Sequence, residues 1–451
     1  MNSSRVTLAV FAAALVVFIS ASSALAMPHF SRKYAVPCAT CHSAWPKLTD
    51  TGVQFKFNGY QLPDGQDGEE ASKLPLNDSL FMDIGPANPP ASVILHGGAT
   101  LIQPNHGYAG KQEGKFFCCV EGSEVNLEVA GSAAANIAYR LSLPWGSENI
   151  AQGYLRFVNL FSPGFLGLDV GLMDVVDNDV VSDRDSWFAF PLASYWGSPT
   201  HPLSSPVGMG AHISDTGGRV YGRPGYGMFS YELGVFTGSG IAGKMTDDNA
   251  QAYTAMGRGD IGPVSFSLRH WGNKTAWLEH SAVSAEGETL VFRPDPTLLD
   301  EKTDHLIFGG RYADPMFVVD LVLDRATYNL TAPRNIMDGE TVLHTFEQSP
   351  LNRTGMSLSL TVIFNQWMEG GVAASVINAE KYTRTVDGVA EEVAATSTAI
   401  GQIRFTFSPA INTRLALEAQ LDLTGADGRI GADGKQYPAQ NRLIAQWQLA
   451  L

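Results

Sequence analysis

The stretch Ser357-Leu358-Ser359-Leu360-Thr361-Val362-Ile363-Phe364 decides the fold class of this chain. Leucine, valine and phenylalanine alternate in it with serine, threonine and isoleucine, and a period of two is typical of a β-strand with one apolar face. The same alternation recurs at residues 137–143, 166–172, 229–235, 414–423 and 443–451. The pattern predicts a mainly β chain from about residue 92 onward.

Two architectures share this pattern. A soluble β-sandwich turns the apolar face inward, whereas a transmembrane barrel turns it outward to lipid. The segments run for about 10 residues, as outer-membrane strands do, and only 17% of the residues are charged, against about 25% in ordinary soluble domains. We therefore predict a transmembrane antiparallel β-barrel over residues 91–451, with about 16 strands (range about 14–18). The sandwich remains the alternative.

Aromatic residues and the end of the chain also favour a barrel. Residues 443–451 are predicted to form an amphipathic last strand, with Leu443, Ala445, Trp447, Leu449 and Leu451 on one face. Such a strand is similar to the last strand of outer-membrane barrels. Aromatic side chains near predicted strand ends suit interfacial girdles: Tyr154, Phe157, Trp187, Trp196, Trp367 and Trp447.

Residues 1–26 read as a secretory signal. Arg5 provides the basic start, residues 6–19 are apolar, and Ala24-Leu25-Ala26 is a cleavage site, so we expect the mature chain to begin at Met27. The apolar run is shorter than the about 20 residues that a membrane helix needs. The expected location is the outer membrane of a Gram-negative-type bacterium.

Cys38-Ala39-Thr40-Cys41-His42 is a CxxCH motif. In an exported chain this spacing indicates a c-type haem, with two thioether bonds to the cysteines and an axial nitrogen from the histidine. We expect one covalent haem c on Cys38 and Cys41, with His42 as iron ligand. A thioredoxin-like pair, a structural zinc site and a plain disulfide are the alternatives. The other cysteines, Cys118-Cys119, are best explained as an inert or vicinally bonded pair.

Residues 27–90 are predicted to form a small helical cytochrome segment. Thr49 or Asp50 can cap a helix over residues 51–60, and Gly59 can end it. A segment of about 60 residues buries too little surface to be stable alone, so we expect it to lean on the barrel, inside the lumen. His29 and Met82 are the nearest candidates for the sixth iron ligand, with His96 and His106 further along.

The N-terminal segment resembles a known family. Met27–His42 (MPHFSRKYAVPCATCH), Pro46–Thr49 (PKLT) and Phe55–Tyr60 (FKFNGY) are similar to the start of the fused outer-membrane monohaem cytochrome–porins of iron-oxidising and related redox-active bacteria. The resemblance implies a haem plug in an outer-membrane barrel. It also implies electron transfer from an extracellular reductant, Fe(II) in the iron-oxidising members, to a periplasmic c-type cytochrome or other electron carrier.

The net charge of the chain limits the classes of partner that we expect it to bind. The net charge of −15 disfavours nucleic acid and suits cations, and outer-membrane lipid is expected around the barrel. The acidic run Asp174, Asp177, Asp179, Asp183 and Asp185 is either a solvated loop or a cation-attracting part of the pore. Whether the chain acts as an Fe(II) oxidase is open at this stage. The alternatives are a solute-diffusion porin with a haem-bearing plug and a soluble periplasmic haem protein.

Overall fold

The computed structural model describes residues 29–34, 36–44, 47–62, 74–75, 81–82, 91–104, 115–118, 124–134, 136–144, 152–175, 178, 180, 214–237, 251–275, 280–283, 289–292, 301–330, 334–338, 341–365, 367–410, 413–423, 429–430, 436–437 and 440–450.

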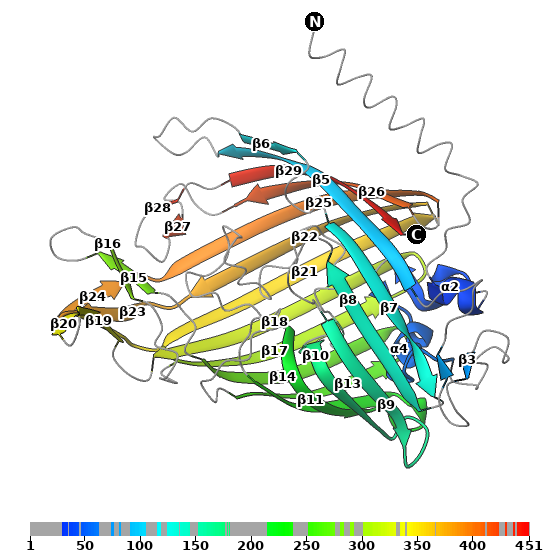
Figure 1. Cartoon of the computed structure of the whole chain (residues 1–451). Coiled ribbons are helices and arrows are strands. Elements are labelled where there is room, and N and C mark those ends of the chain that lie inside the picture. Colours follow the sequence, from blue (N-terminus) through cyan, green and yellow to red (C-terminus); the bar gives the residue numbers. More distant parts are fainter. Residues whose placement is uncertain are drawn as a thin grey trace, which may run out of the picture.

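The strands close into one antiparallel barrel with 16 strand positions (Figure 1). Two short strands share one position, because β7 pairs with the first half of β5 and β6 with the second half. The wall strands are β5 (Ala91–Pro104), β6 (Lys115–Cys118), β7 (Glu124–Ala134), β8 (Ile137–Pro144), β9 (Gln152–Leu160), β10 (Leu166–Asp174), β11 (Ser214–Gly222), β12 (Phe229–Phe236), β13 (Ala252–Ile261), β14 (Val264–Thr275), β17 (Glu301–Ala313), β18 (Phe317–Leu330), β21 (Leu351–Asn365), β22 (Met368–Ala379), β25 (Thr396–Ala410), β26 (Thr413–Asp422) and β29 (Gln440–Ala450).

The last strand closes the barrel. β29 pairs with β5 from Gln440↔Pro104 to Ala450↔Ile94, and Trp447 lies opposite Gly97. Closure leaves no free edge among the wall strands, which a backbone crossing lipid requires. The predicted barrel and the predicted strand count are confirmed.

The two faces of the wall are inverted relative to a soluble protein. In β21, Leu358 and Leu360 face outward and are 49% and 39% exposed, while Ser357, Ser359 and Thr361 are buried inside. Leu233, Val235, Ile403 and Leu417 are likewise exposed on the outer surface. This polarity is that of a barrel surrounded by lipid, and it excludes the β-sandwich.

One predicted girdle residue points the other way. Tyr154 is buried inside the barrel, because it has the same strand parity as the buried Arg156 on β9. Trp367 and Trp447 are exposed on the outside, as predicted. Trp187 and Trp196 lie outside the described residues.

The two ends of the barrel differ. One end has short turns, such as Gly262-Pro263 between β13 and β14. The other has long connections that carry small sheets of their own (Figure 1). These sheets are β15 (His280–Val283) with β16 (Thr289–Phe292), then β19 (Arg334–Asp338), β20 (Thr341–Gln348), β23 (Tyr382–Val386) and β24 (Val389–Val393), and finally β27 (Arg429–Ile430) with β28 (Gln436–Tyr437).

The N-terminal helices lie at the short-turn end of the barrel (Figure 1). The segment consists of α2 (His29–Tyr34), α3 (Cys38–Cys41), β1 (His42–Ala44), β2 (Lys47–Leu48) and α4 (Asp50–Phe57), followed by β3 (Leu74–Pro75) and β4 (Phe81–Met82). The helix predicted over residues 51–60 is present as α4, which begins at Asp50 after the N-cap Thr49 and ends earlier than predicted, at Phe57, with Asn58 as its C-cap. Among the described residues, no helix is long and apolar enough to cross a membrane.

Candidate functional site

The CxxCH motif occupies a single helical turn. Cys38 and Cys41 are the first and last residues of α3, and His42 begins β1 directly after it. Residues three apart lie on the same face of a helix. Cys41 and His42 are partly buried, whereas the side chain of Cys38 lies outside the described residues. The backbone therefore places Cys38 and Cys41 one helical turn apart with His42 directly after them, and two thiols and an imidazole are the donors that a covalent haem uses.

Helix α4 packs against this turn and supports it. The Thr49 hydroxyl accepts from Gly52 N at the helix start and donates to Thr40 O at 2.7 Å, and Thr49 N donates to Cys41 O. Gly52 makes the approach possible, since a Cβ at this position would lie 2.2 Å from Cys41 O. The motif is thus held against α4 through its backbone.

Aromatic rings join α2 to α4. Phe30 stacks on Tyr60 with ring centroids 5.4 Å apart and meets Phe55 edge-on at 5.0 Å. The Tyr34 hydroxyl donates to Tyr60 O at 2.8 Å. Phe55 and Tyr60 also pack against Ala130 and Ala138 of the barrel wall. The N-terminal segment is too small to form a hydrophobic core alone, and it forms one together with residues of β7 and β8.

Inward-facing side chains of the wall bind the end of α4. Arg156 Nη1 on β9 donates to Lys56 O at 2.6 Å, and the Tyr60 and Tyr154 hydroxyls are 2.8 Å apart. Gln61 Nε2 donates to Ala134 O at 3.3 Å. The N-terminal segment therefore packs against inward-facing residues of the barrel, as expected, and it does so at the short-turn end.

Residues near two turns of the barrel also bind the end of α4. Together with the contacts of Arg156, Tyr154 and Ala134, they form the site that holds the N-terminal segment, called the seat below. Asn159 Nδ2 donates to Asn58 Oδ1 at 2.8 Å. The hydroxyl of Tyr226, in the short helix η4 (Pro224–Tyr226), contacts Asn58 Oδ1 and lies 2.8 Å from Asn159 Oδ1. Burial raises the pKa of Tyr226, and the hydrogen bond to Asn159 offsets part of that rise. Arg223 Nη2, just before η4, pairs with Asp50 at 2.6 Å.

Next to this seat, a ladder of buried charges crosses the inner wall. Asp169 on β10 accepts from Arg156 Nη2 and Arg219 Nε, both at 2.7 Å. Arg219 Nη1 then lies 3.6 Å from Glu232 Oε2, and Arg269 Nη1 donates to Glu232 Oε1 at 2.7 Å. All five side chains are fully buried. The charges alternate in sign along β9, β10, β11, β12 and β14, and Thr254 of the intervening strand β13 accepts from Arg269 Nη1 at 2.6 Å. This alternation compensates for the desolvation of each charge.

The chain after β10 turns into the barrel and meets this ladder. Asn178 Nδ2 donates to Glu232 Oε2 at 2.6 Å, and Val180 N donates to Ser267 Oγ at 3.2 Å. Asp174, the first member of the predicted acidic run, is buried at the end of β10. Asp177, Asp179, Asp183 and Asp185 lie outside the described residues. The start of this run is therefore part of the barrel interior and not a solvated loop.

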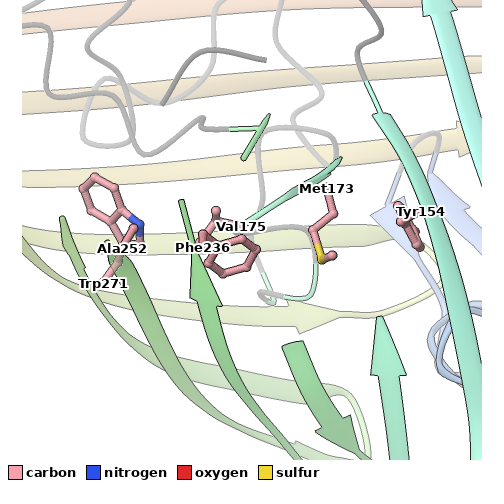
Figure 2. Packing of buried hydrophobic residues seen from close by; sticks show 6 residues of the cluster. All are labelled: Tyr154, Met173, Val175, Phe236, Ala252 and Trp271. Carbon is pink, nitrogen blue, oxygen red and sulfur yellow. The ribbon is translucent and has the colours of Figure 1, made fainter. Parts of the chain in front are cut away.

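An apolar cluster lies beside the ladder, on the side of the long loops. Figure 2 shows its residues projecting from β9 to β14 toward a common interior. Tyr154 and Trp271 each stand two residues from a ladder arginine on their own strands, Arg156 and Arg269. The members are Tyr154, Met173, Val175, Phe236, Ala252 and Trp271. Charges and apolar side chains together fill this side of the barrel.

For several predicted site residues, the structure describes the backbone but not the side chain. His29 belongs to α2 and Met82 to β4, but their side chains lie outside the described residues, as do the side chains of His96 and Cys118. His106 and Cys119 fall there entirely. In the part of the chain that the structure describes, no group of three or more His, Cys, Asp or Glu residues could hold a metal ion.

Sequence reasoning missed the residues of the wall that hold the segment. Asp169 and Glu232 lie in the middle of predicted strands, on the face that the alternation marks as polar. A charged residue at such a position was a signal in the sequence that could have identified these two residues. Their pairing with Arg156, Arg219 and Arg269 needed the order of the strands. The contacts of Asn58 with Asn159 and Tyr226 had no local signal.

No family model and no curated protein matches the chain. Solved structures do match it. In-vitro folded OmpT, an outer membrane protein of Vibrio cholerae, has a TM-score of 0.54 at 9% identity, covering 84% of this chain and 100% of that one. The loop L8 deletion mutant of OmpT gives 0.51 at 9%, covering 80% and 99%.

An anion-selective porin from Comamonas acidovorans gives a TM-score of 0.49 at 12% identity, covering 80% of this chain and 98% of that one. The fold is that of an outer-membrane β-barrel. At these identities, the likeness to OmpT concerns the fold alone.

Proposed function

We propose that this protein transfers electrons across the outer membrane through one haem c bound to Cys38 and Cys41, with His42 as axial ligand. The observation that carries the proposal is the position of a CxxCH turn at the short-turn mouth of a barrel, fixed there by α4. In outer-membrane barrels, short turns face the periplasm and long loops face the outside. The haem would then lie within reach of a periplasmic c-type cytochrome or other carrier.

The residues present suit a haem. The two cysteines share one helical turn, His42 follows directly, and both Cys41 and His42 are only partly buried. When bound, the haem supplies a centre that accepts and releases one electron. The chain's residues would do the rest: α4 supports the turn, Arg156 fixes the depth of the segment, and His29 or Met82 is a candidate for the sixth ligand.

The donor would arrive from the long-loop end. Acidic residues outnumber basic ones by five to one over residues 276–300, the connection between β14 and β17. Negative charge at a pore mouth raises the local concentration of cations. Fe(II) would lose one electron to become Fe(III), and the periplasmic carrier would take up that electron. Cys38, Cys41 and His42 would hold the haem that supplies the one-electron centre between them.

Anaerobic mixing of the purified oxidised protein with Fe(II), followed in the haem absorption bands, tests this proposal. Rapid reduction is the expected result. If dithionite reduces the haem and Fe(II) does not, iron is removed as the donor. If the purified protein has no covalent haem, the proposal fails altogether.

A solute-diffusion porin is the second candidate, because the chain forms a closed transmembrane-type barrel. The ladder and the inward segment at Asn178 oppose free passage along β9–β14. Liposome swelling with small sugars separates the two functions, because a diffusion porin admits them freely and a filled barrel does not.

A further inference from the structure

Two residues that follow the CxxCH turn bond back to its last three residues. Leu48 of β2 pairs with His42 of β1. Thr49 N donates to Cys41 O at 2.9 Å, and the Thr49 hydroxyl donates to Thr40 O at 2.7 Å. The backbone of Thr40, Cys41 and His42 is therefore fixed by contacts with Leu48 and Thr49.

The Thr49 hydroxyl serves α3 and α4 at the same time. It donates its proton to Thr40 O, and as the N-cap of α4 it accepts from Gly52 N at 3.2 Å. A hydroxyl can do both, because it has one O–H donor and two acceptor lone pairs. Carbonyl groups in the last turn of a helix have no partner within that helix. The bond from Thr49 therefore satisfies a carbonyl that α3 cannot satisfy by itself.

Gly52 makes the close approach of α4 to the motif possible. A Cβ at this position would lie 2.2 Å from Cys41 O and 3.1 Å from Leu48 Cδ2. Glycine inside a helix is destabilising relative to alanine. The sequence therefore gives up helix stability at a point where α4 touches the backbone of the CxxCH turn.

We propose that Thr49 is a positioning residue for His42, the axial ligand of the proposed haem. Contacts that orient a metal-ligating histidine tune the metal, and such contacts are one of the means by which a protein sets the potential of a haem iron. His42 directly follows the two residues that Thr49 holds, so loss of the Thr49 hydroxyl loosens the backbone that carries the imidazole. The inference rests on the proposed function, because it requires a haem on Cys38 and Cys41.

Three variants of the full-length protein with its haem separate the bond to Thr40 from the cap of α4. Thr49→Val keeps the shape of the side chain and loses the hydroxyl. Thr49→Gly also loses the hydroxyl, but glycine is nearly as good an N-cap as threonine, so α4 is little affected. Thr49→Ser keeps both hydrogen bonds.

We expect the potential of the haem to follow the hydroxyl. Thr49→Val and Thr49→Gly should change the ratio of reduced to oxidised haem at a fixed electrode potential by about tenfold, which is a shift of about 59 mV in the midpoint potential of a one-electron couple. The electron paramagnetic resonance spectrum of the oxidised protein should change as well, because it reports on the orientation of the axial ligands. Thr49→Ser should match the wild-type protein in both measurements.

The matched control is Gln54, in the same helix. Its Nε2 donates to Asp50 Oδ2 at 2.7 Å in an exposed contact, and this contact does not involve the CxxCH turn. Gln54→Ala therefore weakens α4 and leaves the bonds of Thr49 in place. We expect it to change neither the midpoint potential nor the spectrum.

Hydrogen exchange supplies a readout that does not need the haem. In the Cys38→Ser/Cys41→Ser background, Thr49→Val should speed amide exchange over residues 38–44, and Thr49→Ser should not. Unchanged exchange in Thr49→Val would overturn the inference, even if a Thr49 variant fails to acquire haem. Heat-modifiable gel migration checks that each variant has a folded barrel.

Two further results would overturn the inference. One is faster exchange with an unchanged potential and spectrum, because the contact would then be structural only. The other is an equal change of potential in Gln54→Ala. If the wild-type protein has no covalent haem, the proposed function fails and the inference fails with it. A haem that Fe(II) does not reduce, but whose potential follows the Thr49 hydroxyl, removes iron as the donor and leaves the role of Thr49 standing.

Discussion

At the scale of single residues, backbone strain gathers where the N-terminal segment meets the barrel. Five non-glycine residues of the described part have positive φ, and three of them, Tyr60, Asn159 and Tyr226, belong to this contact. Such conformations cost about 1–3 kcal/mol each and persist only where surrounding contacts hold them. The hydrogen bonds among Asn58, Asn159 and Tyr226 do so here.

Many of the contacts that hold the N-terminal segment in the barrel involve Arg156. It donates to both oxygens of Asp169 and to Lys56 O, and its guanidinium lies over the rings of Tyr60, Tyr154 and Tyr221. We predict that Arg156→Met lowers the free energy of unfolding by about 3–5 kcal/mol, because one member of a buried ion pair is lost. Urea unfolding and proteolysis of the N-terminal segment measure the effect.

The control for this variant lies on the neighbouring strand. Arg140 also reaches Tyr60, at 3.4 Å, but its pair with Glu128 is 3.6 Å long and partly exposed. Arg140→Met should therefore cost only about 0–1 kcal/mol. Equal losses in the two variants would contradict the role assigned to Arg156.

At the scale of elements, α4 depends on both its neighbours. It supports α3 through Gly52 and Thr49, and it is itself bound by β9 and by the turn at η4. The helix has eight residues, which is too short to be stable in isolation. Its position is therefore set by the barrel.

The turn contact should respond to alkaline pH. Since burial raises the pKa of Tyr226, the folded state favours the neutral phenol. Its contribution is fully present below the unfolded pKa of about 10 and is lost as the pH rises through the higher folded value. We expect faster proteolytic release of the N-terminal segment at about pH 11 than at about pH 8.

Substitution of this tyrosine isolates the effect. Tyr226→Phe should release the segment more readily at neutral pH and should flatten the pH dependence. Tyr231→Phe is the control, because the Tyr231 hydroxyl donates to Phe165 O away from α4. An unchanged pH profile in Tyr226→Phe would show that another group is responsible.

At the scale of the whole molecule, the barrel closes without the CxxCH turn. β29 pairs with β5 through the backbone, and Thr49 N, at the start of α4, donates to Cys41 O of α3. We predict that Cys38→Ser/Cys41→Ser loses covalent haem staining but keeps heat-modifiable migration and outer-membrane fractionation. A double variant that fails to form a barrel would mean that haem attachment is a condition of folding.

Local pattern was sufficient for much of this structure. Alternation over residues 357–364 predicted β21 and its outward leucines, and Thr49 predicted the start of α4. Both signals act between residues close in the chain, through strand parity or through capping. The fold class and a helix beside the CxxCH turn could be predicted for this reason.

The seat of that turn could not be predicted. Arg156 meets Lys56 across 100 residues, and Arg223 meets Asp50 across 173. Such partners are chosen only when sixteen strand positions close in one register. Closure turns Tyr154 inward and brings together the charged residues of β9, β10, β11, β12 and β14, which are Arg156, Asp169, Arg219, Glu232 and Arg269. The sequence by itself determined that there is a barrel and a CxxCH turn. The tertiary structure decided which end of the barrel receives the turn, and that the nearby interior is filled by paired charges, because closure alone brings those side chains together.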